Sequence, residues 1–560
     1  ELYAAYEDVL RREGAVDFPE LLLRSYELLS ANEVLRDHYR SRFRHILVDE
    51  FQDTNRLQYR WLKLLTGPGA SLFCVGDDDQ SIYRFRGAHV GNMADFEREY
   101  QVRNVIRLEQ NYRSHGNILD AANALISNNR NRLGKNLWTS AGEGEPIRVY
   151  QAQTDGYEAA FIAEEIASLA RDGYARREMA VLYRSNAQSR VIEHALFSQG
   201  IPYRVYGGLR FFERMEIKHA LAYLRLLANP EDDGAFLRVV NFPTRGIGAR
   251  SVEAVQDAAR VQGTSLWQAA CTLKGKAATT VGTFVRLIEA MRAGTATLPL
   301  QEVVEHVIHA SGLIDHYRGE KDGQDRVENL EELVNAAAAF VQESEEAPVP
   351  AEGAEPPPPA DPLNAFLSHA ALESGENQAA EGTDAVQLMT VHSAKGLEFH
   401  CVFIGGLEEG LFPHEQSMNE ADGLEEERRL MYVAITRART RLYLTFAQTR
   451  LLHGQTRYNV ASRFLDEIPA PITKWLTPKL GRMPDSSSAW RAAEPLPRYA
   501  TPSSKSDAGF RVGQEVVHAK FGQGVIVDAE GRGNETRLQI NFGPNGVKWL
   551  AAAYANLTPV

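Results

Sequence analysis

Two adjacent carboxylates at the end of an apolar run are the first residues whose types suggest catalysis. The stretch "ILVDEFQDT", residues 46–54, places Asp49 and Glu50 directly after three apolar residues. At the end of a buried strand, Asp49 could bind Mg²⁺ while Glu50 accepts a proton from an attacking water. Two solvated acids at a strand end would have the same sequence, so the pair alone leaves both interpretations open.

A second apolar run ends in polar and aromatic residues. It reads "LFCVGDDDQSIYRFRGA" and covers residues 72–88. Gln80 follows the strand in a loop, where its amide could contact the γ-phosphate of a nucleotide. Tyr83 and Phe85 alternate with arginines, and this pattern suits single-stranded nucleic acid because aromatic rings stack on bases while cations neutralise phosphates. A core aromatic pair flanked by surface charges is the competing interpretation.

Two further arginines are candidates for phosphate binding. Arg113 follows Tyr112 in "RLEQNYRS", and the planar guanidinium can donate two parallel hydrogen bonds to a phosphate. Arg437 is expected on the apolar face of a helix with Leu430 and Val433, where a charged residue needs a partner or must point into a cleft. A phosphate would satisfy either arginine, and so would a buried carboxylate.

Two glycine-containing turns complete the set of candidates. "MTVHSAKGLEFHCVFI" places His392 and Glu398 in a turn between two apolar runs, which is typical of a site but also of an ordinary loop. "NFPTRGIGARSVEAV" places Gly246 and Gly248 just before a predicted helix, whose first amides could hold a phosphate without reading sequence. A plain helix–helix turn explains the second stretch equally well.

The pattern of apolar runs predicts the elements that position these residues. From residue 45 to about Tyr206, short apolar runs alternate with helical stretches, which indicates an α/β fold. The expected strands lie in residues 45–48, 71–75, 104–108, 146–150 and 179–183. Residues 207–380 read as mostly helical, and apolar runs return at 385–390, 401–406 and 441–446. We therefore expect one α/β domain that a helical insertion interrupts.

Composition bounds the class of protein. The chain has 560 residues, 44% of them hydrophobic, and no apolar run approaches the roughly 20 residues that cross a bilayer. The three cysteines, Cys74, Cys271 and Cys401, are far apart, which argues against a disulfide framework or a zinc ribbon and suits a reducing cytosol. The net charge of −13 does not itself suggest nucleic-acid binding, but local patches decide that interaction.

Five motifs in this order closely resemble those of the UvrD/PcrA/Rep helicases of superfamily 1, and most closely bacterial UvrD/PcrA. The motifs read "DEFQDT", "GDDDQSIYRFRGA", "LEQNYRS", "VHSAKGLEF" and "RRLMYVAITRA". The resemblance covers nearly the whole chain. It implies an α/β fold with two RecA-like motor domains, the first incomplete, a helical insertion in the second, and a small C-terminal Tudor-like β-barrel. It also implies ATP-dependent 3′→5′ unwinding of DNA in repair or replication restart.

The resemblance and the apolar pattern together divide the chain into segments. We expect a helical remainder of the first-domain insertion (1–44), the C-terminal part of the first motor domain (45–103), the second motor domain in two segments (104–206 and 381–468), a helical insertion that contacts duplex DNA (207–380) with a disordered loop (344–362), a flexible linker (469–509) and the barrel (510–560).

The resemblance also implies a role for each matching residue. On the nucleotide side, Asp49 and Glu50 bind Mg²⁺ and activate water, Gln80 and Arg113 contact the γ-phosphate of ATP, Arg437 is the arginine finger, Tyr112 stacks on adenine and Glu398 holds the ribose. On the DNA side, Phe18, Tyr83, Phe85, Asn186 and His392 contact the single strand, and Gly246 and Gly248 grip the duplex. Phe85 stands where many relatives have tryptophan, and His453 where relatives can carry phenylalanine.

One expected motif is missing. No GxxxxGK[ST] phosphate loop occurs in residues 1–560, and the family's loop lies further upstream of its "DE" motif than the 48 residues before Asp49. We therefore expect a chain that begins partway through the first motor domain and is inactive without the missing segment. The alternative is a non-catalytic fragment that binds DNA and partners. The resemblance further implies single-stranded DNA and its junction with duplex as substrates, RNA polymerase or repair proteins as barrel partners, no membrane, and a cytoplasmic, nucleoid-associated location in a bacterium.

Overall fold

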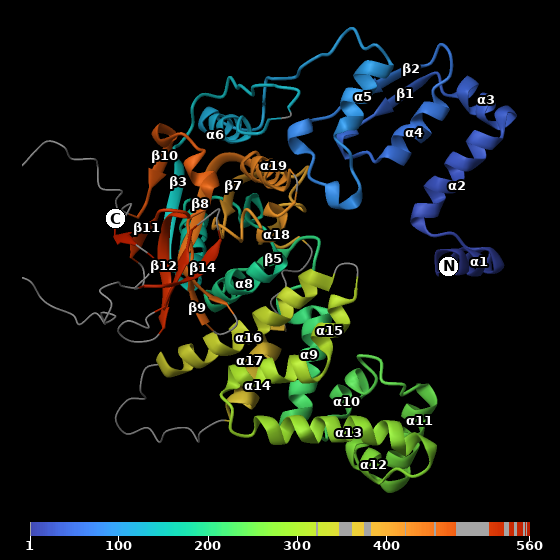
Figure 1. Cartoon of the computed structure of the whole chain (residues 1–560), viewed down its shortest axis with the longest axis vertical. Coiled ribbons are helices and arrows are strands. Elements are labelled where there is room, and N and C mark those ends of the chain that lie inside the picture. The colour runs from blue at the N-terminus through green and yellow to red at the C-terminus, as the bar shows by residue number, and fades with distance from the viewer. Residues whose placement is uncertain are drawn as a thin grey trace, which may run out of the picture.

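The computed structural model describes residues 2–130, 132–320, 323–346, 361–374, 382–420, 422–452, 455–477, 514–530, 537–542 and 546–552, together with Ala555 and residues 557–559. Figure 1 shows an N-terminal α/β part, a larger α/β part built on a long sheet, a helical part that extends away from that sheet, and a small C-terminal sheet. None of the helices in these ranges combines the length and apolarity that a bilayer crossing would require.

The N-terminal part consists of helices around a two-stranded sheet. Its elements are α1 (Leu2–Glu13), α2 (Phe18–Ala31), α3 (Glu33–Arg42), β1 (His45–Val48), η1 (Phe51–Asp53), α4 (Arg56–Leu65), β2 (Ser71–Cys74), η2 (Asp78–Gln80), η3 (Arg84–Arg86) and α5 (Gly91–Glu99). β1 and β2 pair in parallel. Asn55 begins α4 with a capping box that includes Gln58, which satisfies amides left free in the first turn.

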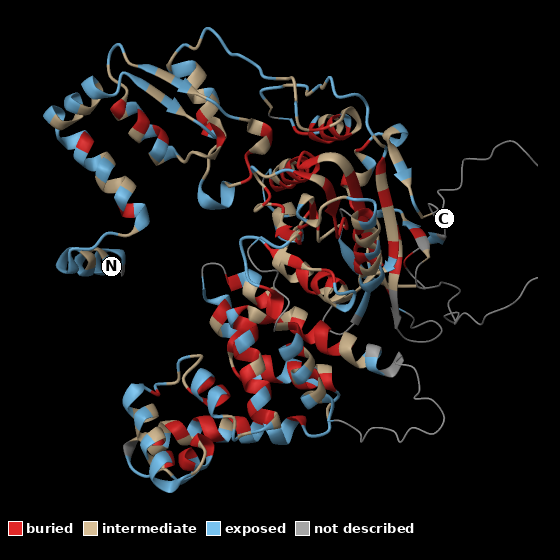
Figure 2. Ribbon diagram, turned by 180° about the vertical axis from the view of Figure 1, so that it is seen from behind, coloured by how far each residue is buried: buried red, intermediate tan, exposed pale blue. Residues whose placement is uncertain are grey.

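The two strands are covered on only one side by described residues. Phe51 and Tyr59 pack edge to face beneath them, with ring centroids 5.9 Å apart. On the other side, Leu47 is 76% exposed and Phe73 is 56% exposed. In Figure 2 the N-terminal part is mostly exposed or intermediate, whereas buried residues are concentrated in the larger sheet and in the helical part.

The larger sheet is built from two segments of the chain. Its strands are β3 (Ile147–Thr154), β4 (Met179–Tyr183), β5 (Tyr203–Val205), β6 (Val386–Thr390), β7 (Phe399–Ile404), β8 (Ala438–Leu452), β9 (Gln455–Tyr458) and β10 (Thr473–Trp475). The order is β10-β3-β8-β7-β4-β6-β5, all parallel, with β9 antiparallel to β8. Because β6, β7 and β8 pair with β3, β4 and β5, the prediction of one α/β domain interrupted by helices is confirmed.

Helices cover both faces of this sheet. α6 (Gly116–Ile126) and α19 (Gly423–Ile435) pack on one face, whereas α7 (Asp155–Arg171) and α8 (Ser189–Ser198) pack on the other. All five residues of β4 are buried, as expected for a parallel strand with helices on both sides. The carboxyl ends of the strands therefore open towards loops that carry predicted site residues.

The insertion is helical and has its own core. It contains α9 (Met215–Ala228), α10 (Asp233–Val239), α11 (Ala249–Gln262), α12 (Leu266–Thr272), α13 (Lys276–Thr295), α14 (Leu300–Ala310), α15 (Leu313–Arg318), α16 (Gly323–Glu346) and α17 (Pro362–Ser374). Their apolar faces form one continuous cluster that is separate from the clusters of the sheet. The short elements η4 (Arg176–Glu178), η5 (Asn186–Gln188), η6 (Phe211–Glu213), α18 (Glu415–Met418), α20 (Arg463–Asp466) and η7 (Ala470–Ile472) lie in the connections.

The C-terminal part is a five-stranded antiparallel sheet. Its strands are β11 (Glu515–His518), β12 (Gly522–Glu530), β13 (Arg537–Asn541), β14 (Val547–Ala551) and β15 (Thr558–Pro559), in the order β14-β13-β12-β11-β15. Val516, Ile526, Leu538, Ile540 and Phe542 form its core. Antiparallel strands around a small separate core agree with the predicted Tudor-like barrel.

Two predicted segments differ in detail. Residues 104–108, expected as a strand, pair with no described strand, and Ile106 is 74% exposed, so apolar character there is not accompanied by ladder hydrogen bonds. The expected linker begins with η7 and β10, and β10 pairs in parallel with β3. The rest of that linker (478–509), most of the expected disordered loop (347–360) and His453 lie outside the described residues.

Candidate nucleotide and DNA site

The carboxylate pair lies at the carboxyl end of β1, as predicted. Asp49 and Glu50 are both exposed, and Oδ1 of Asp49 accepts a hydrogen bond from the Glu50 amide at 2.9 Å. Glu50 has φ of 49°, in the left-handed region that non-glycine residues rarely adopt. Such strain often marks functional positions, and here it turns the chain sharply from β1 into η1.

A lysine from the larger α/β part reaches these carboxylates. Nζ of Lys395 lies 2.5 Å from Oδ2 of Asp53 and 3.2 Å from Oε2 of Glu50. It also donates to the backbone oxygen of Gln80 at 2.9 Å. The Lys395 side chain is only 7% exposed, so its ion pair with Asp53 is largely shielded from water. This ion pair connects the two α/β parts. We call the region where the two parts meet, around Asp53 and Lys395, the joint.

Asp53 has an incompletely satisfied carboxylate. Burial raises its pKa above the ordinary value, although the ion pair with Lys395 acts in the opposite direction. Its Oδ1 atom is buried and has no hydrogen-bond partner among the described residues. A buried acceptor without a partner is costly, and a cation or a donor from a ligand would remove that cost.

The three aspartates after β2 hold a loop of the larger part. Nε and Nη2 of Arg132 donate to the two oxygens of Asp79 at 2.7 and 2.6 Å. Lys135 forms an ion pair with Asp77, whose other oxygen accepts from Nε2 of Gln80 at 2.6 Å. The predicted γ-phosphate contact, Gln80, is therefore oriented by an aspartate that is itself bound to the opposite side of the joint.

A second group of predicted nucleotide contacts lies entirely on the larger part. Nε of Arg113 donates to Oε2 of Glu398 at 2.6 Å, and this hydrogen bond lowers the pKa of Glu398. Nη1 of Arg113 also lies 3.4 Å from the backbone oxygen of Thr436. Tyr112, the residue before Arg113, is 84% exposed, and its hydroxyl donates a hydrogen bond to Gln110. An exposed ring beside this ion pair is free to stack on a base.

Arg437 is buried, but it does not lie on the expected helix. α19 ends at Ile435, because the Thr436 amide closes the last turn, and Arg437 leads into β8. The guanidinium is 1% exposed and donates to the backbone oxygens of Val433 and Leu397 and to the Thr436 hydroxyl. Among the described residues it forms no ion pair, so the alternative of a buried carboxylate partner is not realised.

The environment of Arg437 keeps this uncompensated charge next to the joint. Burial, followed by repulsion from Arg113, lowers the pKa of Arg437 to about 10, so the side chain stays protonated at neutral pH. The negative charge of Asp77 raises the pKa of Arg437, so Arg437 lies within electrostatic range of the first α/β part. A buried cation bonded only to neutral acceptors can stabilise an incoming anion.

Three predicted DNA contacts meet at the same joint. The rings of Tyr83 and Phe85 lie 6.0 Å apart, and Phe85 meets His392 edge to face at 5.5 Å. Arg86 lies over both aromatic rings, with Cζ 5.2 Å from the Tyr83 centroid and 5.3 Å from the Phe85 centroid. Phe85 remains 65% exposed. These residues, which we call the aromatic cluster (Tyr83, Phe85, Arg86 and His392), combine exposed π-surface with a cation.

His392 contributes to the aromatic cluster as a neutral ring. Burial, followed by Arg184 and opposed by Glu427, lowers its pKa from the ordinary 6.5 to about 4. Arg184 is itself held by Glu427, with its Nη2 atom 2.8 Å from Oε1. The ring can therefore pack or stack but supplies no positive charge at neutral pH.

The remaining predicted DNA contacts lie elsewhere. Phe18 begins α2 and is 89% exposed. Asn186 opens η5, and its backbone oxygen accepts from Nη1 of Arg214 at 3.0 Å. Gly246 and Gly248 are exposed at the start of α11, where Gly248 is the N-cap and has no side chain to satisfy the first amides. The structure does not bring these residues into the joint.

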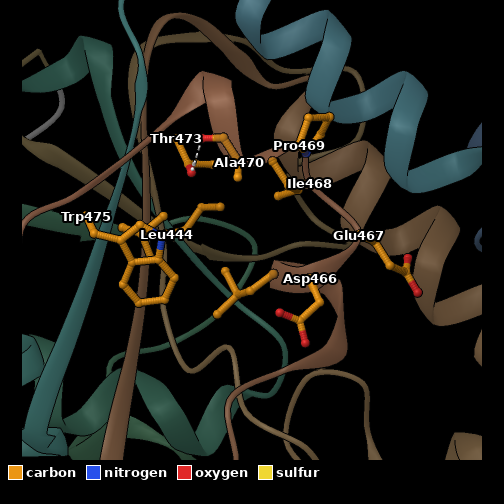
Figure 3. A pocket seen from close by; sticks show the side chains of 10 residues that line it. Leu444, Asp466, Glu467, Ile468, Pro469, Ala470, Thr473 and Trp475 are labelled. Carbon is orange, nitrogen blue, oxygen red and sulfur yellow. Dashed lines mark hydrogen bonds between the residues drawn. The ribbon is translucent and has the colours of Figure 1, made fainter. Parts of the chain in front are cut away.

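A cavity lies away from these residues. It has a volume of about 280 Å³ and lies between β3, β8, β10 and residues 465–470. Figure 3 shows Leu444 and Trp475 on one side and Asp466 and Glu467 on another, with Thr473 hydrogen-bonded to Ala470. None of the predicted nucleotide or DNA residues lines it. We therefore place the candidate site at the joint, where the polar groups converge, and not at this cavity.

Several residues at the joint were not among the predicted site residues. Lys395 lies in the same glycine-containing turn as His392, but no sequence signal pairs it with Asp53, 342 residues earlier. Arg132 and Lys135 lie in a stretch without a recognisable motif, and only the three consecutive aspartates pointed to a need for cations nearby. These contacts depend on how the two α/β parts pack.

The donor set suits a magnesium nucleotide. Asp49, Glu50 and the buried Oδ1 of Asp53 offer hard oxygen ligands, which Mg²⁺ prefers. Arg113 and Arg437 on the larger part carry guanidinium groups that suit phosphate, and Asp77 of the first part acts electrostatically on Arg437. The residues present therefore fit a bound magnesium–ATP complex between the two parts.

Comparison with known proteins identifies similar sequences along the whole chain. Residues 1–101 match the UvrD/REP helicase N-terminal domain, residues 106–449 the UvrD-like helicase C-terminal domain, and residues 512–558 the PcrA/UvrD tudor domain. The chain is 50% identical over 572 residues to DNA helicase II of Escherichia coli, covering 100% of this chain and 76% of the relative. It is 40% identical over 574 residues to the ATP-dependent DNA helicase PcrA of Bacillus subtilis, covering 99% and 76%. Over 580 residues it is 40% identical to the ATP-dependent DNA helicase UvrD1 of Mycobacterium bovis, covering 100% and 75%.

Proposed function

Because the chain belongs to the UvrD/PcrA family of DNA helicases, we propose that it uses ATP to move 3′→5′ along single-stranded DNA and to unwind duplex ahead of it. We further propose that this activity serves DNA repair or replication restart in the bacterial cytoplasm, at the nucleoid. The observation that carries the proposal is the joint itself. Ion pairs of Lys395 with Asp53 and of Lys135 with Asp77 connect the two α/β parts there, beside residues whose chemistry suits phosphate.

The proposed nucleotide roles follow from the position of each side chain. Asp49 and Glu50 would hold Mg²⁺, which when bound would neutralise phosphate charge, and Glu50 would accept a proton from the attacking water. Gln80, oriented by Asp77, contacts the γ-phosphate. Arg113 reaches the same phosphate from the other side of the joint.

The remaining nucleotide contacts lie on the larger part. Arg437 stabilises the negative charge that develops during transfer, because its guanidinium is buried without a carboxylate partner. Tyr112 stacks on the adenine with its exposed ring, and Glu398 holds the ribose through the carboxylate that Arg113 orients. ATP binding would thus draw the two parts together, and its loss would release them.

The proposed DNA path runs over the aromatic cluster. Phe85 and Tyr83 stack on bases, while Arg86 lies close enough to neutralise a phosphate. Phe18 and Asn186, which lie outside the joint, contact the single strand elsewhere along its path. Gly246 and Gly248 hold duplex phosphates at the amides that begin α11. Because Lys395 lies over the Tyr83 ring, at 5.1 Å, the nucleotide and DNA sides share a residue through which they can be coupled.

The phosphate cradle is a separate part of the proposal. Residues 1–560 contain no GxxxxGK[ST] sequence, so we propose that a polypeptide of these residues alone hydrolyses ATP only at background rate. The second candidate is a DNA- and partner-binding fragment without ATP turnover, which would bind the strand but not separate it. We also propose that the terminal sheet binds a protein such as RNA polymerase or a repair factor.

Unwinding polarity tests the proposed function. The full-length protein should separate a duplex with a 3′ single-stranded tail when ATP and Mg²⁺ are present, and a 5′-tailed duplex far more slowly. Omission of either ATP or Mg²⁺ should abolish strand separation without abolishing DNA binding. Strand binding without ATP-dependent separation of either substrate would favour the non-catalytic candidate, and preference for the 5′ tail would contradict the proposed direction.

A further inference from the structure

Two imidazoles and one carboxylate converge where the larger α/β part meets the helical insertion. His194 lies on α8, whereas His369 and Glu373 lie one turn apart on α17. Nδ1 of His194 is 2.5 Å and Nε2 of His369 is 3.0 Å from the same oxygen, Oε1 of Glu373. We propose that these three side chains bind a divalent transition-metal ion of the zinc class, which links α8 of the motor to α17 of the insertion.

The ligand types and spacing suit such an ion. Two imidazole nitrogens and one carboxylate oxygen are common ligands of zinc, with bonds of about 2.0–2.2 Å. Tetrahedral ligands at that distance lie about 3.3 Å from one another, and the three candidate ligand atoms all lie within 4.8 Å. The two contacts to Glu373 therefore need to lengthen by less than about 1 Å to admit the ion.

A small internal space lies at the same place. His194, His369 and Glu373 all line a cavity of about 10 Å³, together with apolar residues that include Phe340 and Phe366. This volume is close to that of one water-sized sphere, so it fits a single ion and no larger ligand. Phe340 packs against the His369 ring at 5.2 Å, which limits how that imidazole can turn.

The same three atoms already contact one another without an ion. Glu373 Oε1 lies within hydrogen-bond distance of Nδ1 of His194 and Nε2 of His369, so these two nitrogens donate to it in the metal-free state. A bound ion would displace those two protons and take their place between the imidazoles and the carboxylate.

Nearby cations are occupied by other acceptors. Arg190, which also lines the cavity, donates to Oε1 of Glu332 at 2.5 Å. Arg210 donates to the backbone oxygen of Glu373 and to Oε1 of Glu213. These contacts join α8 to α16 and residue 210 to α17, whereas a metal would add a direct bond between side chains of α8 and α17. The ion would thereby restrict how the insertion moves relative to the motor.

Metal titration tests the proposal on the tag-free full-length protein. After treatment with a chelator, it should bind one equivalent of Co²⁺ with the visible absorption of a low-coordinate nitrogen–oxygen site, and Zn²⁺ should displace that signal. His369→Gln and Glu373→Gln should each weaken binding by at least about tenfold. Zn²⁺ should raise the melting temperature of the parent and leave that of both variants unchanged.

A matched pair elsewhere provides the control. His316 and Glu320 are also four residues apart and 3.4 Å from each other, but the described residues around them supply no second histidine ligand. His316→Gln should bind cobalt like the parent. If His369→Gln fails to fold, as judged by circular dichroism without metal, His194→Gln on the other helix decides. No stoichiometric cobalt signal in the parent, or equal losses in His316→Gln, would overturn the proposal, and neither result depends on ATP hydrolysis.

Discussion

Phe85 is the most exposed ring of the aromatic cluster and the residue on which single-strand binding should depend most. Its side chain is 65% exposed yet fixed by Tyr83 and His392. Phe85→Ala should weaken oligothymidine binding by about 1–3 kcal/mol, the usual value of one base–aromatic stack. Tyr157→Ala on α7, where the ring is 61% exposed outside the joint, is the control and should bind like the parent. Equal affinities of Phe85→Ala and the parent would contradict the role.

His392 should remain neutral across the physiological range. Its pKa is lowered from 6.5 to about 4, mainly by burial, with Arg184 and Arg86 adding repulsion and Glu427 opposing it. The unfolded chain would take up this proton near pH 6.5, so the contribution of His392 to stability should be present above that pH and decline as the pH falls towards 4. Histidine NMR titration, with His392→Gln to assign the signal, should show a midpoint near 4. A midpoint near 6.5 would show that the ring is solvated.

The sequence allows local chemistry to be predicted better than long-range contacts. Asp49, Glu50 and Gln80 are recognisable because each follows an apolar run that ends in a turn, and a turn after a strand is a local feature. The contact of Lys395 with Asp53 spans 342 residues and depends on packing between two domains. No local pattern encodes such a pair, so the residue that joins the two halves of the site could not be identified from sequence.

At the scale of elements, the start of α11 should act as the contact with duplex DNA. Gly248→Asp introduces a favourable N-cap, so the helix should be retained, but the carboxylate should repel a phosphate at the first amides. Affinity for a junction of single and double strands should fall several-fold, with single-strand affinity unchanged, in a fluorescence anisotropy assay. Gly156→Asp near the start of α7 is the matched control. An equal loss in both variants, or none in either, would remove α11 from the interface.

Element types were predictable where the apolar period is clear and less so at their ends. The strands of the larger sheet were expected from runs such as residues 179–183, which form β4. The end of α19 was missed, because the apolar spacing of Leu430 and Val433 continues to Arg437 although the helix stops at Ile435. β10 was hidden in a proline-rich stretch, and its pairing with β3 is a tertiary contact that composition does not report.

At the scale of the whole molecule, the terminal sheet should be separable from the motor. It has its own core around Val516 and Ile526 and matches a tudor domain. Deletion of residues 510–560 should leave 3′-tailed unwinding by the full-length protein largely unchanged and abolish binding to a partner such as RNA polymerase, measured by co-sedimentation of purified components. A collapse of DNA-stimulated ATP hydrolysis after the deletion would instead make the sheet part of the motor.

The central claim is that one nucleotide site is assembled from both α/β parts, with Glu50 on one side and Arg437 on the other. Its most direct test is the rate of ATP hydrolysis by the full-length protein at saturating single-stranded DNA. Glu50→Gln and Arg437→Ala should each lower that rate by about 10³-fold or more, because they remove the base and the charge that stabilises the transition state. Both variants should still bind single-stranded DNA. Arg457→Gln, a substitution at an exposed residue of β9, is the control and should hydrolyse ATP like the parent. DNA-stimulated hydrolysis that survives in Arg437→Ala while Glu50→Gln abolishes it would show that the larger part does not complete the site.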